Sequence, residues 1–167
     1  MKQFVLAIII IVTYLLQITI IPELTVFGIN PNLILIVVCS IAFLFGSTSG
    51  GVVGFCCGML IDLYYGRNIG LNALLYLYIG IVLGSFNKRI FKDNYLVILV
   101  FMIFTTFIYE MITYVYIVMT YSQSINILSF LSNVISLILI NTILSFFIYP
   151  MLLKINLSLE IDRNIFK

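Results

Sequence analysis

The sequence predicts an all-α integral membrane protein, a bundle of six transmembrane helices. Hydrophobic residues make up 63% of the 167-residue chain and charged residues only 8%, whereas soluble domains carry roughly 25% charged residues. The hydrophobic residues form long uncharged runs, and so little polar surface remains that lipid is the natural solvent. We therefore expect one polytopic membrane domain over residues 1–167, without a soluble domain.

The expected helices follow these uncharged runs. They cover residues 4–21, 33–45, 51–65, 69–86, 95–121 and 127–153. The first run follows a basic residue, as in a signal peptide, but it is longer than the apolar part of such a peptide and lacks a small-residue cleavage site, so we expect an anchor. The uncharged stretch 32–61 is too long for one crossing, and the turn-forming residues 46–51 predict two short helices that meet there.

The basic residues predict the topology. With six crossings and a cytoplasmic N-terminus, only Arg67 lies outside, and the inner residues are Lys2, Lys88, Arg89, Lys92, Lys154, Arg163 and Lys167. Cytoplasmic loops carry the excess of Lys and Arg. We therefore expect a multi-pass protein of the bacterial cytoplasmic (inner) membrane with both termini in the cytoplasm. The loop with Lys88, Arg89 and Lys92 would fix this topology and contact anionic membrane lipids, with cytoplasmic docking as a second possible role.

Several chemistries are disfavoured by composition. The chain has no His and three Cys, two of them adjacent at Cys56 and Cys57, which gives no zinc-ligand spacing and no disulfide framework. The basic residues are too scattered for a nucleic-acid footprint. Only scattered Ser, Thr and Asn could accompany an intramembrane acid, so we expect no enzyme and no cofactor.

Small residues recur at helical spacing in the third expected helix. Gly46, Gly50, Gly54 and Gly58 follow one another every four residues, and Asp62 continues the spacing. Such a stripe lets another helix approach closely in lipid. Two interpretations stay open: packing within this bundle, and a partner-helix groove on Gly50, Gly54 and Gly58.

Two acids fall inside expected helices, Asp62 and Glu110, both in the outer half of the membrane. An intramembrane Asp costs roughly 2.5–3.5 kcal/mol at a helix centre, so each acid is a functional-site candidate. Asp62 could instead be a structural anchor, satisfied by Arg67, by Asn72 or by free backbone amides, and such an anchor would tolerate Asn in place of Asp. Glu110 could be satisfied by the hydroxyls of neighbouring tyrosines, Tyr109, Tyr114 and Tyr116.

The order of these features resembles the rod shape-determining protein MreD family. The resemblance rests on three segments within residues 31–89. They are Pro31-Asn32-Leu33, then Gly50-x-x-x-Gly54-Phe55-x-x-Gly58-x-x-x-Asp62-x-x-x-Gly66, and then Gly70-Leu71-Asn72-Ala73-Leu74-x-Tyr76. Beyond these segments only the length and the hydropathy agree with the family.

The resemblance implies a non-catalytic membrane scaffold of the cell-elongation machinery, needed for rod shape and lateral peptidoglycan synthesis. Its implied partners are the single-span protein MreC, MreB, the glycosyltransferase RodA and a class B penicillin-binding protein. The glycine face would receive a helix such as that of MreC, with Arg67 and Asn72 shaping the outer end of the contact.

Two alternatives stay open beside the scaffold that binds helices. The family is similar in architecture to the substrate-binding S components of energy-coupling-factor vitamin transporters, which would hold a small ligand in an outward-facing cavity. The sequence shows neither the Ala-x-x-x-Ala coupling pattern nor a dense polar lining that this function would need. A purely structural scaffold without any groove is the third class.

Overall fold

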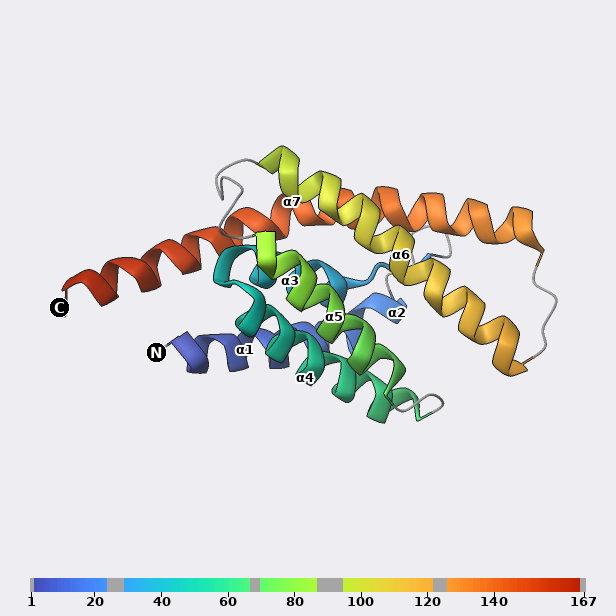
Figure 1. The fold of residues 1–167 in the computed structure, drawn as a ribbon, viewed down its shortest axis with the longest axis horizontal. Helices are drawn as coiled ribbons and strands as arrows, with labels where there is room; N and C mark the ends of the chain where they lie inside the picture. Colours follow the sequence, from blue (N-terminus) through green and yellow to red (C-terminus); the bar gives the residue numbers. More distant parts are fainter. Residues whose placement is uncertain (1, 24–28, 67–69, 87–94, 122–125, 166–167) are drawn as a thin grey trace.

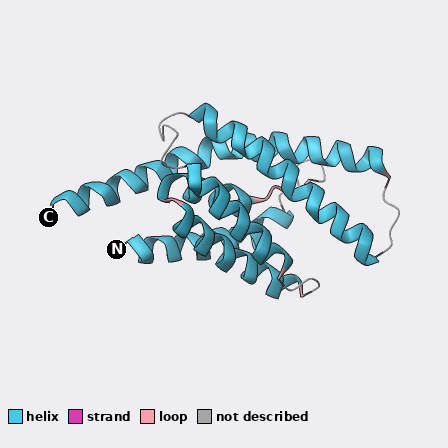
Figure 2. Ribbon diagram, viewed as in Figure 1, coloured by secondary structure: helices cyan, strands magenta, loops and turns pink. Residues whose placement is uncertain are grey.

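The architecture is helical throughout the residues described by the computed structural model, which are 2–23, 29–66, 70–86, 95–121 and 126–165. The elements are α1 (Lys2–Leu15), a π-helical turn η1 (Leu16–Ile20), α2 (Ile21–Glu23), α3 (Leu33–Phe45), α4 (Ser47–Tyr65), α5 (Leu71–Ser85), α6 (Tyr95–Tyr121) and α7 (Ile127–Ile165). In Figure 2 almost all of the described chain is drawn as helix. In Figure 1, α6 and α7 lie side by side above, α1 and α4 lie below, and α3 and α5 lie between them.

The short helix α3 forms the centre of the bundle. Every residue from Ile34 to Leu44 is buried, and α3 contacts α1, α4, α5, α6 and α7. The sequence Leu33–Phe45 is apolar all round, as is typical of a helix with no exposed face. Its lone serine, Ser40, donates a hydrogen bond to the Ile36 carbonyl 2.7 Å away, so the helix brings no unpaired side-chain donor into the core.

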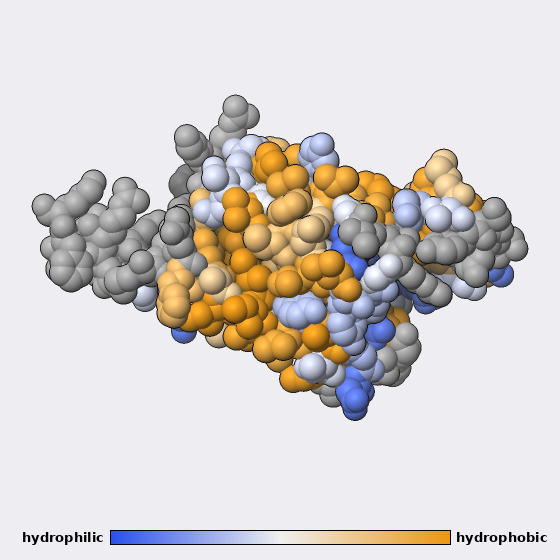
Figure 3. Space-filling view, turned by 90° about the horizontal axis from the view of Figure 1, so that it is seen from below, coloured by the Kyte–Doolittle hydropathy of each residue, from blue (hydrophilic) through white to orange (hydrophobic). Residues whose placement is uncertain are grey.

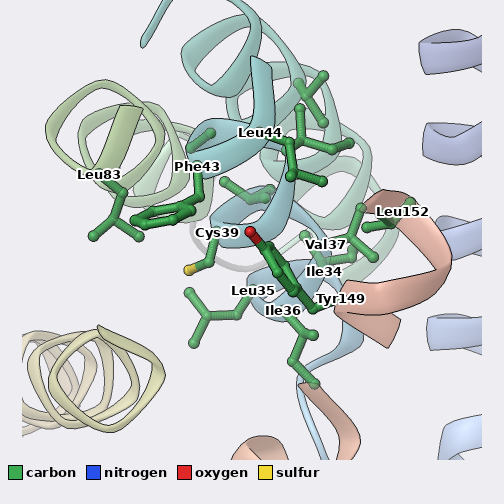
Figure 4. Packing of buried hydrophobic residues seen from close by; sticks show 14 of the residues in the cluster. Ile34, Leu35, Ile36, Val37, Cys39, Phe43, Leu44, Leu83, Tyr149 and Leu152 are labelled. Carbon is green, nitrogen blue, oxygen red and sulfur yellow. The ribbon is translucent and has the colours of Figure 1, made fainter. Parts of the chain in front are cut away.

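Aromatic residues tie α3 to its neighbours on two sides. The Phe43 ring lies 6.0 Å from that of Phe101 on α6 and 6.3 Å from that of Tyr149 on α7, measured between centroids. Figure 4 shows Phe43 beside Leu83 of α5, with Tyr149 and Leu152 of α7 nearby. These spacings fall in the range of favourable aromatic pairs, so α5, α6 and α7 share one core with α3.

The glycine stripe of α4 packs against α5 of the same chain. A Cβ atom added at Gly54 would lie 2.3 Å from the Tyr76 carbonyl oxygen, and one added at Gly58 would lie 2.4 Å from the Ala73 Cα. At Gly50 it would lie 2.8 Å from the Gly80 carbonyl oxygen and 2.5 Å from the Ala42 Cβ. The expected groove for a partner helix on these glycines is therefore corrected: α5, and α3 at Gly50, fill that face, and packing within the bundle is what the structure shows.

Two helices differ from their expected ends by more than two residues. The helix expected from residue 51 begins at Ser47, because the turn after α3 needs only Gly46, whose φ of 89° is accessible to glycine without steric cost. The helix expected to end at residue 153 continues to Ile165 through Pro150. Proline removes one backbone hydrogen bond, and such a loss is tolerated in membrane helices.

Length and hydropathy fit a membrane protein. Within the described residues, three helical stretches are long and apolar enough to cross a membrane: Phe4–Glu23, Leu96–Thr120 and Ile127–Ser158. The helices α3 and α5 are apolar but shorter. The face seen in Figure 3 is largely hydrophobic, and hydrophilic residues gather toward the side where α4 ends. Such a surface is suited to contact with lipid tails.

The glycine packing predicts a large loss of stability on adding one methyl group. Gly54→Ala should lower the free energy of unfolding by about 2 kcal/mol or more, since its Cβ would meet backbone rather than a movable side chain. Gly51→Ala is the matched control, because its Cβ would meet only side-chain atoms of Ile81 and Leu77. Thermal unfolding of the purified variants in detergent measures both. Equal midpoints for the two variants would contradict the close packing of α4 and α5.

Candidate functional site

Polar side chains meet at the end of the bundle where α3 begins. Successive helices α3, α4 and α5 run in alternating directions, so the start of α3, the end of α4 and the start of α5 lie at the same end of the bundle (Figure 1). This arrangement brings together Asn32, which precedes α3, Asp62 near the end of α4 and Asn72 in the first turn of α5. Gln17 of η1 joins them from the first helical segment.

Asp62 caps the N-terminus of α5 from a neighbouring helix. Its Oδ2 accepts hydrogen bonds from the backbone N–H groups of Gly70 (2.9 Å) and Ala73 (3.0 Å). Its Oδ1 accepts from the Asn72 side-chain amide (2.8 Å) and the Asn72 backbone N–H (3.3 Å). The first N–H groups of a helix have no partner within it and favour negative charge. Asp62 is 2% exposed and acts as the anchor that the sequence allowed, with Asn72 and backbone amides as its partners.

A stacked tyrosine pair continues the hydrogen bonds from α5 to α6. The Tyr109 hydroxyl donates to the Asn72 side-chain oxygen at 2.6 Å. The rings of Tyr76 and Tyr109 are stacked at 5.3 Å with an interplanar angle of 4°. The Tyr76 hydroxyl accepts a hydrogen bond from the Asn32 amide at 2.8 Å, and its proton can go to Tyr109 or to Asn32, both at 3.2 Å. Asn32 and Asn72 are thereby linked across the bundle.

Asn32 also connects α3 to α7. Its side-chain oxygen accepts a hydrogen bond from the Leu35 backbone N–H at 2.9 Å, as an N-cap residue does. Its own backbone N–H donates to the Asn141 side-chain oxygen at 3.0 Å, and the Asn141 amide donates to the Thr106 hydroxyl of α6 at 3.4 Å. Asn141 is fully buried, so an amide inside the longest helix holds the start of the central helix.

Gln17 supplies the contact from η1. Its side-chain amide donates to the Pro31 carbonyl at 3.2 Å, and its side-chain oxygen accepts from the Leu33 backbone N–H at 2.7 Å. Backbone groups at membrane depth need internal partners, because lipid offers none. Gln17 therefore satisfies the segment that leads into α3.

A cavity of about 260 Å³ lies beside this network. Five elements, η1, α3, α4, α5 and α6, and the segment before α3 contribute its lining, which consists of Gln17, Asn30, Pro31, Asn32, Ile34, Ile61, Tyr65, Asn72, Tyr76, Tyr109, Glu110 and Thr113. Within the described part of the chain, no hydrogen bond reaches the Glu110 carboxylate, and the buried Thr113 hydroxyl has no partner. The expectation that Tyr109 satisfies Glu110 is wrong, because its hydroxyl bonds Asn72 and Tyr76.

The structure brings together only some of the site residues that the sequence predicts. Asp62 and Asn72 meet directly, and Glu110 lines the adjoining cavity. Arg67, Lys88, Arg89 and Lys92 lie outside the described residues. Gln17 and Asn141 were not singled out, although each is an amide inside a long uncharged run. Among the described residues, no group of three His, Cys, Asp or Glu side chains could hold a metal ion.

Comparison with known proteins identifies one family. The family model for MreD, described as rod shape-determining protein MreD, matches residues 1–156. It confirms the resemblance seen in residues 31–89 and extends it over most of the chain. No curated protein and no solved structure matches the chain.

The contacts of Asp62 predict the effect of removing its charge. The Asp62 carboxylate is the acceptor in all four of its hydrogen bonds. Asp62→Asn would replace one of the two accepting oxygens by an NH₂ group, which would then face N–H donors. We expect a loss of about 1.5–3 kcal/mol in unfolding free energy, not the tolerance first expected of an anchor. The Glu110 carboxylate accepts no such hydrogen bonds from the described residues, so Glu110→Gln should change the thermal unfolding midpoint little. Thermal unfolding in detergent compares the two, and a stable Asp62→Asn variant would refute the cap.

Proposed function

The chain belongs to the MreD family of rod shape-determining proteins, and from this membership we propose that it is a non-catalytic scaffold of the cell-elongation machinery. The observation that carries the proposal is the family match over residues 1–156 of 167. The scaffold would be needed for rod shape and lateral peptidoglycan synthesis. It would act in the bacterial inner membrane with MreB, RodA and a class B penicillin-binding protein. The comparisons give no support to the alternative of a vitamin-transporter S component.

A scaffold of this kind would act by binding partner transmembrane helices, such as that of MreC. Because α5 covers the glycine stripe, the partner helix needs another surface. A groove of about 390 Å³ lies between α5 and α6. Its lining is apolar except for Thr105 and consists of Leu75, Tyr78, Ile79, Val82, Leu83, Phe86, Phe101, Phe104, Thr105, Ile108 and Ile112.

This groove suits the side chains of a third helix. In lipid, helices associate through close packing rather than through hydrophobic gain, and a hollow between two helices offers contacts on both sides of an inserted side chain. Several lining residues are well exposed, among them Val82 (55%) and Phe104 (61%). The Thr105 hydroxyl already donates to the Phe101 carbonyl at 2.7 Å, so an apolar occupant leaves it satisfied. We therefore assign the MreC-like helix to this groove.

We further propose six crossings with both termini in the cytoplasm, as the distribution of Lys and Arg predicts. The 13 residues of α3 span only about 20 Å, less than the hydrocarbon thickness of about 30 Å. Neighbouring helices enclose α3 on all sides, so it need not match the lipid itself. In this topology the network around Asn32 and Asp62 lies at the outer end of the bundle.

Depletion in the native host tests the scaffold. We expect cells to round or widen, and nutrient supplements should fail to restore the rod shape. Microscopy of cell width in rich medium, with and without added vitamins, is the measurement. Normal rods, or a defect cured by a vitamin, would contradict the proposed role.

Bulk in the groove tests the partner surface. Val82→Trp should reduce co-purification of a co-expressed MreC-like protein at least about tenfold, because the indole would fill the space of the incoming helix. Leu139→Trp on α7, at a position that is similarly exposed (58% against 55%), is the matched control. Circular dichroism checks that both variants fold. Co-purification of Val82→Trp at the wild-type level would exclude the groove, and leave lipid tails as its occupant.

Cysteine labelling tests the topology. In a background without Cys39, Cys56 and Cys57, Asn30→Cys should react with a membrane-impermeant maleimide in intact spheroplasts. Ser158→Cys, near the far end of α7, should react only after the membrane is permeabilised. Both side chains are exposed, so burial does not protect them. The reverse labelling pattern would overturn the orientation.

A further inference from the structure

Among the described residues, no side chain forms a hydrogen bond or an ion pair with the Glu110 carboxyl group. It is half-buried in α6 and lines the cavity beside the polar network. The other described carboxylate in this region, Asp62, already accepts four hydrogen bonds. A carboxylate at membrane depth is costly without a counter-charge. When Glu110 is ionised, the cavity carries one net negative charge, and a cation bound there would offset the cost of that charge.

The acceptors around the cavity define what kind of cation fits. Thr113 lies one helical turn beyond Glu110 on the same face of α6, and its buried hydroxyl oxygen has no partner. Two carboxylate oxygens and one hydroxyl oxygen can receive the three N–H donors of a primary ammonium group. The tyrosine rings of Tyr65, Tyr76 and Tyr109 also line the cavity, and aromatic faces attract cations.

Size separates an organic cation from a bare ion. The cavity of about 260 Å³ would hold about nine water molecules at roughly 30 Å³ each, far more space than one monovalent ion takes. A divalent metal would need more anionic ligands than one carboxylate. The side-chain amides of Gln17, Asn32 and Asn72 already donate to the Pro31 carbonyl, the Tyr76 hydroxyl and the Asp62 carboxylate respectively, so they shape the wall.

We propose that this cavity binds a primary ammonium group, with the Glu110 carboxylate and the Thr113 hydroxyl as its acceptors. The group can come from an aminophospholipid headgroup or from a small soluble amine, since both carry the same chemistry. The proposal goes beyond the scaffold function and does not depend on it.

The test uses the full chain in nanodiscs of phosphatidylglycerol, which carries no amine. Ethanolamine and its neutral analogue ethylene glycol are titrated against the wild-type protein, Glu110→Gln and Glu23→Gln, and the unfolding midpoint is followed by circular dichroism. Glu23→Gln is the matched control, because Glu23 ends α2 and does not line the cavity. A second arm adds phosphatidylethanolamine and counts retained lipids by native mass spectrometry.

Ethanolamine should raise the midpoint of the wild type and of Glu23→Gln by mass action, and ethylene glycol should not. Glu110→Gln should bind ethanolamine at least about tenfold more weakly, as expected when one partner of a charge pair is removed. Retention of phosphatidylethanolamine that is lost only in Glu110→Gln assigns the group to lipid. Binding of ethanolamine without such retention assigns it to a soluble amine.

Three results would overturn the proposal. The first is equal binding by the wild type and Glu110→Gln in both arms. The second is equal stabilisation by ethylene glycol, which would indicate a polar cavity without charge selectivity. The third is ethanolamine binding that appears only in Arg67→Ala, which would mean that the chain supplies its own counter-charge.

Discussion

The bundle depends on satisfying the start of α5 with the Asp62 carboxylate. Lipid cannot solvate the free N–H groups of a helix end, and the N-cap residue of α5, Gly70, has no side chain that could cap the helix. Asp62 takes that role from α4, which fixes the two helices in register. In this register Gly54 faces the Tyr76 carbonyl and Gly58 faces Ala73. The Asp62 cap and the glycine packing thus hold the same pair of helices, α4 and α5, in one register.

The same principle connects the helix pair to the rest of the molecule. Asn72 receives the Tyr109 hydroxyl while it bonds Asp62, and Tyr76 passes the connection to Asn32 and through it to Asn141. The segment η1 and the helices α4, α5, α6 and α7 therefore contribute polar groups to the network at the start of α3. The opposite half of α3 is held by apolar packing around Phe43. Hydrogen bonds therefore hold the start of α3, and apolar packing holds its other half.

The sequence predicts much of this fold, and its failures have physical causes. The apolar run 33–45 coincides with α3, since a uniformly apolar segment bounded by Asn32 and Gly46 has one obvious extent. The glycine spacing identifies a face for close helix contact but does not identify the helix that packs on it. The glycines Gly80 and Gly84 form a complementary stripe on α5 and indicate packing within the chain. Gln17 and Asn141 are detectable as amides in apolar runs, but their common partner segment near Asn32 is visible only in three dimensions. The helix α7 extends beyond its predicted end because the loss of hydropathy at Lys154 ends an apolar run without ending a helix.

The length of α7 has a mechanical consequence. Its 39 residues extend about 58 Å, nearly twice the hydrocarbon thickness of about 30 Å, and the part before Pro150 is already long enough to cross it. The helix stays packed in the core as far as Leu153 and Asn156, and its last turns project from the bundle as a continuation of the same rod in Figure 1. Pro150 removes a backbone hydrogen bond within the packed part of α7, and the helix bends most easily there. A small tilt of the half that Asn141 ties to the start of the central helix becomes a larger sideways displacement at the far end of so long a helix.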